Sequence, residues 1–128
     1  MVFLDIKSAF DRVWHDGLLY KLKYLGVTGS LLNWFKNYLY NRSQKVVIKG
    51  TSSATKTITA GVPQGSILGP LLFKIFINDF GSDLCSESFL FVDETSLLKL
   101  YNHSLINETI TFIDKDLEKI SAWAESWR

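Results

Sequence analysis

The sequence predicts an α+β domain in which helices pack on one face of an antiparallel sheet. Short runs of β-branched and aromatic residues end abruptly in acids at Asp5 and at Asp93-Glu94, as buried strands do when they finish at an exposed edge. Longer segments repeat apolar residues every three or four positions, which is typical of amphipathic helices. These elements follow one another in the order β-α-α-β-β-α-β-β-α, and this order favours helices covering hairpins.

Composition places the chain among globular proteins of one domain. It has 128 residues, of which 47% are hydrophobic, and nine Phe, five Tyr and four Trp are available to fill a core. Cys85 is the single cysteine, which excludes an internal disulfide and thiolate metal sites. Asp5 and Lys7 interrupt the first apolar run, so no secretory signal is evident. The most apolar stretch, 67–80, is too short and too charged to span a bilayer. We expect a soluble intracellular protein with no membrane partner.

The first part of the chain is expected to fold as a strand and two helices. The strand covers 2–6 and is followed by a turn at 10–14. A helix follows at 17–25, and Gly26 ends it. Ser30 caps a second helix. The apolar side of this second helix comprises Leu31, Trp34, Phe35, Tyr38 and Leu39.

The middle of the chain combines a hairpin, a loop and a helix. The β-rich runs 46–48 and 57–59 are joined by 50–53, which predicts that they pair as a hairpin. One proline and two glycines make 61–65 a loop. A largely buried helix is expected over 71–80, directly after a proline.

The last part of the chain is expected to form a hairpin and a long helix. Strands at 88–93 and 96–101 flank Asp93-Glu94-Thr95, so the acidic pair is expected at the tip of a tight turn. The tail is amphipathic over its whole length. Its apolar face comprises Ile106, Ile110, Ile113, Leu117, Ile120, Ala124 and Trp127.

Basic residues are concentrated in the first half of the chain. Nine Lys and Arg residues but only two acids lie between Lys7 and Lys56, whereas five basic and ten acidic residues lie from Thr57 onward. A basic surface with interleaved aromatics such as Trp34 and Tyr38 follows a phosphate backbone in nucleic-acid-binding proteins. A solvated, lysine-rich face accounts for the same charges.

The acids at the strand ends are candidate metal ligands. If their strands lie side by side, Asp5, Asp93 and Glu94 converge, and close like charges need a cation to stay ionised. Carboxylate oxygens with room for water and phosphate suit Mg²⁺ or Mn²⁺, the ions of two-metal phosphoryl transfer. The alternative is that these acids are solvated or cap the next helix.

Three segments resemble, in order and spacing, the motifs of one family. Residues 3–13 (FLDIKSAFDRV) are similar to the first metal-binding motif of reverse transcriptases, and 61–73 (GVPQGSILGPLLF) to their second motif. Residues 89–98 (FLFVDETSLL) stand where the family has its aromatic-X-Asp-Asp hairpin. Trp34-Phe35 and Asn78-Asp79 resemble the non-long-terminal-repeat (LINE-type, Jockey-like) retrotransposon branch. The resemblance implies a polymerase palm core, with 1–128 a partial reverse transcriptase domain.

This resemblance implies catalytic and metal-binding residues. Asp5, Asp93 and Glu94, with the backbone carbonyl of Ile6, are expected to hold two ions of Mg²⁺ or Mn²⁺. These ions activate the primer 3′-hydroxyl and bind the incoming deoxynucleotide triphosphate. RNA template, DNA primer and deoxynucleotide triphosphates are therefore the implied partners.

The resemblance also implies a nucleotide-binding set. Phe10 matches the family's aromatic steric gate, a ring that clashes with a 2′-hydroxyl; the alternative is a core Phe beside a turn. Gln64 and Gly65 resemble the loop that touches nucleotide and template, and Gly65 lets backbone approach closely. The alternative for this loop is an ordinary Pro-Gly turn.

Four further polar residues, in the first motif or just after it, have weaker signals. Lys7 and Arg12 are placed to neutralise nucleic-acid phosphates, and a surface salt bridge explains either equally well. Asp11 lies one residue past the gate and is expected to be structural, and His15 is given no catalytic role.

Two departures from the family pattern predict weak activity. Glu94 replaces the second aspartate of the hairpin and moves the charge one methylene further out, while octahedral Mg²⁺ is demanding about distance. The fingers and thumb segments that normally pack on a palm are missing, so apolar surface is expected to be exposed. We therefore expect an RNA-directed DNA polymerase domain that is impaired or inactive in isolation. The alternatives are a non-catalytic nucleic-acid-binding remnant of a retroelement and a decayed product with no activity.

Overall fold

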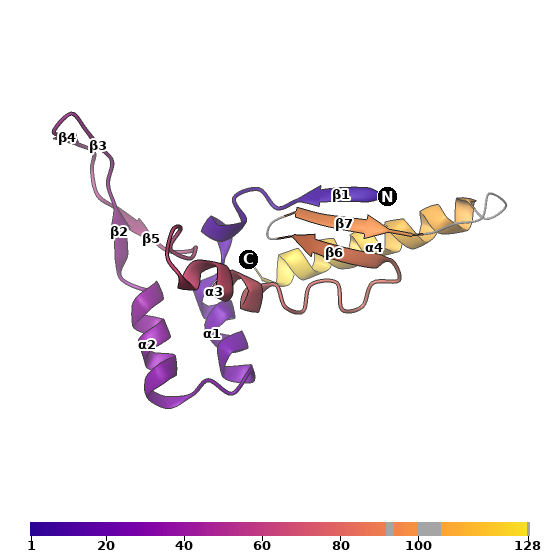
Figure 1. Cartoon of the computed structure of the whole chain (residues 1–128), viewed down its shortest axis with the longest axis horizontal. Coiled ribbons are helices and arrows are strands. Elements are labelled where there is room, and N and C mark those ends of the chain that lie inside the picture. Colours follow the sequence, from indigo (N-terminus) through magenta and orange to yellow (C-terminus); the bar gives the residue numbers. More distant parts are fainter. Residues whose placement is uncertain (92–93, 100–105, 128) are drawn as a thin grey trace. The chain divides into compact units, whose positions relative to one another are not determined.

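The computed structural model describes residues 1–91, 94–99 and 106–127, with the backbone alone at Phe91 and Glu94. The chain divides into two compact units (Figure 1). We call Met1–Ala9 with Ile77–Arg128 the sheet unit, and Phe10–Phe76 the helical unit. The mixture of helices and antiparallel strands agrees with the predicted α+β class. No helix in the described ranges combines the length and the apolar character needed to cross a membrane.

The sheet unit is built on three antiparallel strands in the order β1-β7-β6, which run side by side in Figure 1. These strands are β1 (Val2–Asp5), β6 (Glu87–Phe91) and β7 (Glu94–Leu98). The predicted hairpin is therefore confirmed, but Glu94 and Thr95 belong to β7 and not to its tip. The reason is that Thr95 pairs with Leu4 on one side and Leu90 on the other, and its β-branched side chain is buried.

Helix α4 (Ile106–Ser126) confirms the predicted C-terminal helix and runs along the sheet (Figure 1). Its most buried residue is the acidic Asp116, which is 0% exposed. The Asp116 carboxylate accepts hydrogen bonds from the backbone N–H groups of Cys85 and Ser86, with a donor–acceptor distance of 2.9 Å in both bonds. These bonds fix α4 to the backbone that enters β6. The predicted apolar face is only partly covered, since Ile106 and Ile110 are exposed.

The helical unit packs three helices around an apolar core. Helices α1 (His15–Tyr24), α2 (Gly29–Leu39) and α3 (Leu68–Phe76) are joined to a short 3-10 turn, η1 (Ala9–Arg12). The core of this unit comprises Val13, Leu18, Leu22, Leu39, Val62, Leu72, Phe73 and Phe76. A lysine shares this interior, because Lys21 is buried and donates from Nζ to the carbonyl oxygen of Phe76.

The predicted first residues of α2 and α3, and the predicted last residue of α3, were wrong. Thr28, and not Ser30, is the residue before α2, and its side chain makes no capping bond. Helix α3 begins three residues before the predicted start, because the Ser66 hydroxyl accepts from the Gly69 N–H and so caps the first turn. Pro70 fits inside this first turn, where its missing N–H costs nothing. The predicted helix end at Phe80 was also too late, since its N–H closes a separate turn on Ile77.

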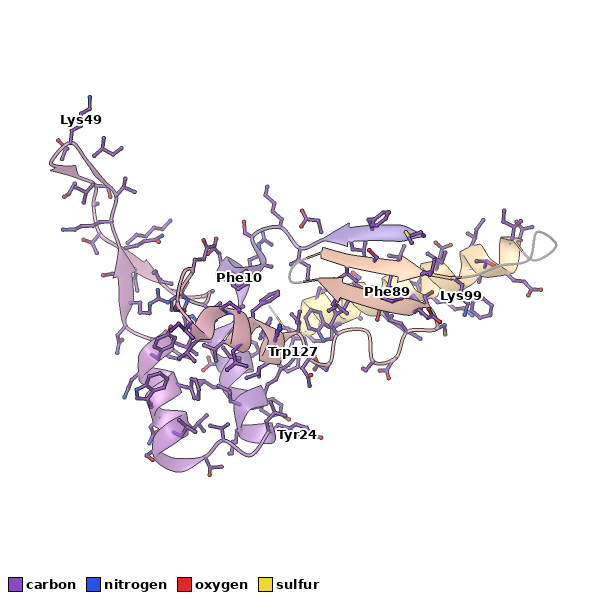
Figure 2. The ribbon with its side chains drawn as sticks, in the orientation of Figure 1. Phe10, Tyr24, Lys49, Phe89, Lys99 and Trp127 are labelled. Atoms are coloured by element: carbon purple, nitrogen blue, oxygen red, sulfur yellow. The ribbon has the colours of Figure 1, made fainter. Side chains whose placement is uncertain are left out.

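The hairpin between α2 and α3 is longer than predicted and has another register. β2 (Arg42–Gln44) pairs with β5 (Lys56–Ile58), and β3 (Val47–Ile48) pairs with β4 (Thr51–Ser52). The predicted pairing of 46–48 with 57–59 was therefore wrong. Lys49 and Gly50, both with positive φ, form the tight turn that joins β3 to β4. Figures 1 and 2 show the hairpin tip, with Lys49, standing away from the helices of its own unit.

Candidate functional site

Two of the predicted metal-binding positions lie opposite one another at one end of the strand ladder. Asp5, the last residue of β1, is exposed, and its Cα lies directly opposite that of Glu94, the first residue of β7. Asp5 also lines a hollow of about 300 Å³ with Phe3, Leu4 and Thr95. The third predicted carboxylate, Asp93, lies outside the described residues.

These positions supply ligands that suit a hard divalent cation. Two carboxylate residues at opposite positions of one ladder, followed by the backbone carbonyl of Ile6 directly after β1, are oxygen donors of the kind that Mg²⁺ and Mn²⁺ prefer. Within the described ranges no group of three or more His, Cys, Asp or Glu residues is gathered as a metal site. In their chemistry, the described residues therefore fit such an ion.

The helical unit brings three of the predicted nucleotide-binding residues to one surface pocket. This pocket has a volume of about 500 Å³. It is lined by Phe10, Pro63, Gln64, Gly65, Ser66, Ile67 and Pro70. The Phe10 ring stacks on Phe73 of α3, with centroids 4.7 Å apart and planes at 23°, so a buried aromatic supports it from behind. Figure 2 labels Phe10 beside α3.

Backbone pairing holds the two walls of this pocket together. The N–H of Gly61 donates to the carbonyl oxygen of Val13, and the N–H of Val62 donates to the carbonyl oxygen of Phe10. The donor–acceptor distance is 2.8 Å in both bonds. Gly61 has a φ of +93°, and a Cβ there would lie 2.9 Å from the Cα of Asp11. Only glycine lets the two segments approach this closely. Gly65 also has a positive φ but no atom within 4 Å of a Cβ, so its backbone conformation, and not crowding, favours glycine.

One side-chain contact made by the pocket residue Gln64 was not expected. Gln64 donates from Nε2 to Oδ1 of Asp11 over 3.0 Å. Asp11 was expected to be structural, and its hydrogen bond orients a residue of the predicted nucleotide-binding loop. No local signal links the two residues, because they lie 53 positions apart in the sequence.

His15 is the second residue whose role the sequence did not indicate. It is 2% exposed, and its Nε2 lies 2.8 Å from the carbonyl oxygen of Gly61. The edge of its ring meets Tyr40, whose hydroxyl donates to Asp16. That hydrogen bond raises the pKa of Tyr40. The imidazole is thus held among the start of α1, the end of α2 and the pocket loop.

A second hollow, which we call the basic groove, lies beside the pocket within the helical unit. It has a volume of about 560 Å³. It is lined by Asp11, Arg42, Gln44, Lys56 and residues 57–64. Pro63 and Gln64 line both hollows and therefore form the ridge between them. Lys7 and Arg12, the predicted nucleic-acid-binding residues, are exposed and are not among the residues that line the groove.

The two units differ sharply in charge. The helical unit contains nine basic and two acidic residues, and no acid occurs between Gly17 and Asn78. The sheet unit contains five basic and eleven acidic residues. The strand-end positions Asp5 and Glu94 therefore belong to the acidic unit, and the Phe10 pocket belongs to the basic one.

Comparison with known proteins gives a consistent set of relatives. The family model described as reverse transcriptase (RNA-dependent DNA polymerase) matches residues 1–128. The RNA-directed DNA polymerase from mobile element jockey of Drosophila melanogaster is 39% identical over 98% of the chain, and that of Drosophila funebris is 37% identical over 98%. A probable RNA-directed DNA polymerase from transposon BS of Drosophila melanogaster is 35% identical, again over 98%. The chain spans 14% of the length of each of these three relatives.

Proposed function

The chain belongs to the reverse transcriptase (RNA-dependent DNA polymerase) family, and on this premise we propose that it forms the palm-like core of a retrotransposon RNA-directed DNA polymerase of the jockey type. The observation that carries the proposal is the pocket in which Phe10, Gln64 and Gly65 meet. These residues come from two segments about 50 positions apart, and together they provide an aromatic wall, an amide and an accessible backbone. Such a pocket suits a nucleoside triphosphate.

The pocket selects deoxynucleotides through the ring of Phe10. A sugar lying against this ring leaves no room for a 2′-hydroxyl, because Phe73 backs the ring and prevents it from moving away. The Gln64 amide meets the nucleotide from the opposite wall, and Gly65 presents backbone without a side chain. The pocket then distinguishes deoxynucleotides from ribonucleotides by steric exclusion, because Phe73 holds the Phe10 ring in place.

The strand-end acids hold the catalytic metal. Asp5, Asp93 and Glu94, with the Ile6 carbonyl, are the residues that would bind two Mg²⁺ or Mn²⁺ ions. When bound, such ions activate the primer 3′-hydroxyl and stabilise charge on the attacking and leaving oxygens. Glu94 carries its carboxylate one methylene further from the backbone than an aspartate does. Since misplacement by about 1 Å can cost about a hundredfold in rate, Glu94 makes the site slow.

RNA template and DNA primer are the partners of this reaction. Arg42 and Lys56 in the basic groove, together with the exposed Lys7 and Arg12, supply positive charge for their phosphates. The shared ridge at Gln64 places the groove next to the nucleotide pocket. Such an arrangement suits a strand that runs past the incoming nucleotide.

Primer extension tests the enzyme function directly. The native chain, Asp5→Ala and Glu94→Asp are compared on an RNA template with a DNA primer, in Mg²⁺ and in Mn²⁺. We expect weak extension by the native chain, none by Asp5→Ala, and faster extension by Glu94→Asp. Absence of extension by all three proteins in both metals would overturn the polymerase function for this chain.

A second function, RNA binding without chemistry, is favoured by the charge of the helical unit. Its test is the salt dependence of RNA binding by the native chain, Asp5→Ala and the double variant Arg42→Gln/Lys56→Gln. If the groove carries the binding, the double variant lowers the slope of log K against log salt by about 1.4, since each single-strand phosphate contact contributes about 0.7. Lys23→Gln/Lys74→Gln, the same charge change on exposed residues outside the groove, is the matched control. Binding that survives Asp5→Ala without any extension would favour this second function.

A further inference from the structure

The buried imidazole of His15 donates a hydrogen bond to the loop that forms the Phe10 pocket. Its Nε2 lies 2.8 Å from the carbonyl oxygen of Gly61. A carbonyl oxygen only accepts hydrogen bonds, so Nε2 carries the proton and donates. His15 and Gly61 are both buried, and water therefore does not replace this donor when it is lost.

The position of the imidazole is fixed by its neighbours. His15 is the first residue of α1, so its backbone is set by the helix. Its ring meets the Tyr40 ring edge-on, with centroids 5.3 Å apart and planes at 62°. The Tyr40 hydroxyl is in turn held by Asp16, the next residue of α1. The imidazole is thus a rigid donor and not a mobile side chain.

Gly61 is the residue at which the pocket loop leaves the core. Its N–H is bonded to Val13, and the next N–H, that of Val62, is bonded to the Phe10 carbonyl. With its left-handed backbone, the peptide after Gly61 sets the direction of the chain toward Gln64. The donor on His15 holds the carbonyl of that peptide. Loss of the donor would leave a buried carbonyl unpaired and would release the rotation of the peptide.

We propose that His15 is a positioning residue for nucleotide selection, acting through the Gly61 carbonyl. It holds the wall formed by Pro63, Gln64 and Gly65 at a fixed distance from Phe10, so that the pocket accepts a deoxyribose and excludes a ribose. The inference rests on the proposed function of the pocket. A purely structural histidine would change stability alone, whereas a positioning histidine also sets the ratio of deoxynucleotide to ribonucleotide affinity.

Two substitutions of His15 distinguish the effect of its N–H donor from the effect of its side-chain volume. His15→Gln retains an N–H group at about the distance of Nε2 from the backbone, and His15→Met fills the space without a donor. Leu22→Val, in the buried face of the same helix, is the matched control for a general loss of packing. All are made in the full chain of 128 residues.

The first measurement is amide hydrogen exchange at Gly61 and Val62 by NMR. Both amides are bonded to the segment that carries Phe10, so their protection reports the attachment of the loop. We expect His15→Met to accelerate their exchange about tenfold more than Leu22→Val does, and His15→Gln to restore most of the protection. Equal acceleration in His15→Met and Leu22→Val would overturn the proposal.

The second measurement is the affinity for dATP and for ATP in Mg²⁺, by titration. We expect His15→Met to reduce the preference for dATP severalfold, and His15→Gln and Leu22→Val to keep it. An unchanged preference in His15→Met would overturn the role in selection. If the native chain binds neither nucleotide, the proposed function of the pocket fails, and the exchange data alone decide whether His15 positions the loop.

Discussion

The side chain of Gln64 is tied to Asp11 by a hydrogen bond of 3.0 Å from Nε2 to Oδ1. The bond joins the loop after the hairpin to the turn that carries Phe10. The carboxylate engages one of the two N–H groups of the Gln64 amide, so the amide oxygen and the second N–H are left to meet a ligand. Asp11 thus fixes the orientation of the Gln64 amide.

The first prediction concerns this pair. Asp11→Ala removes the acceptor, whereas Asp11→Asn keeps an acceptor oxygen and removes only the charge. We expect Asp11→Ala to weaken dATP binding about threefold to tenfold, and Asp11→Asn to retain most of the affinity. Both residues are exposed, so the free energy of unfolding should change by less than about 1 kcal/mol in either variant. Titration and urea unfolding measure the two effects, and equal loss of affinity in both variants would contradict the role of this bond.

The second prediction concerns the support behind the gate. Phe73→Leu removes the ring on which Phe10 stacks, at a cost on the order of 1 kcal/mol beyond the area lost. With room to move backward, Phe10 should exclude ribose less well, and the ratio of dATP to ATP affinity should fall. Leu72→Val, a neighbouring change in the same buried core, is the control and should leave the ratio unchanged. A lower ratio in both variants would show general loosening and not loss of the stack.

Local patterns predicted most of the elements but not their partners. β1, the β6–β7 hairpin and α4 were predicted because their apolar spacing is contained within each segment. The register of the β2–β5 hairpin could not be predicted in this way. It depends on left-handed backbone at Asn41 and Lys49, two residues that carry side chains and give no glycine signal.

Individual residues show the same contrast between what local sequence patterns predict and what depends on distant contacts. Family resemblance indicated Phe10 and Gln64, but the contacts of His15 and Asp116 join residues 46 and about 30 positions apart. One signal for Asp116 was present: it lies three residues after Ile113 and four before Ile120, inside the apolar stripe of α4. A charged residue at such a position predicts a buried polar contact. Lys21 of α1 carries the same signal, since it lies three residues after Leu18 and four before Leu25, the residue that follows the helix.

The third prediction compares two glycines of the pocket loop. Gly61→Ala adds a Cβ 2.9 Å from the Asp11 backbone at a φ of +93°, and it should lower the free energy of unfolding by about 2–4 kcal/mol. Gly65→Ala has a similar φ of +75° but no atom nearby, so it should cost only about 1 kcal/mol. Urea unfolding of the two variants measures the difference, which isolates the close approach of the two segments. Equal losses would show that backbone conformation alone requires glycine at Gly61.

The fourth prediction concerns pH and the carboxylate of Asp116. Burial on its own raises the pKa of this carboxyl, but the Ser86 side chain, the backbone N–H groups of Cys85 and Ser86, and Lys119 lower it by more, so the pKa is lowered overall. The unfolded chain then binds the proton first, and the stability from Asp116 is present above its unfolded pKa of about 3.9 and lost as pH falls through the folded pKa. Asp116→Asn should cost about 1.5–3 kcal/mol at neutral pH and should flatten the loss of stability on acidification. Asp114→Asn, exposed on the same helix, is the control, and parallel pH profiles of the native chain and Asp116→Asn in urea unfolding would refute the prediction.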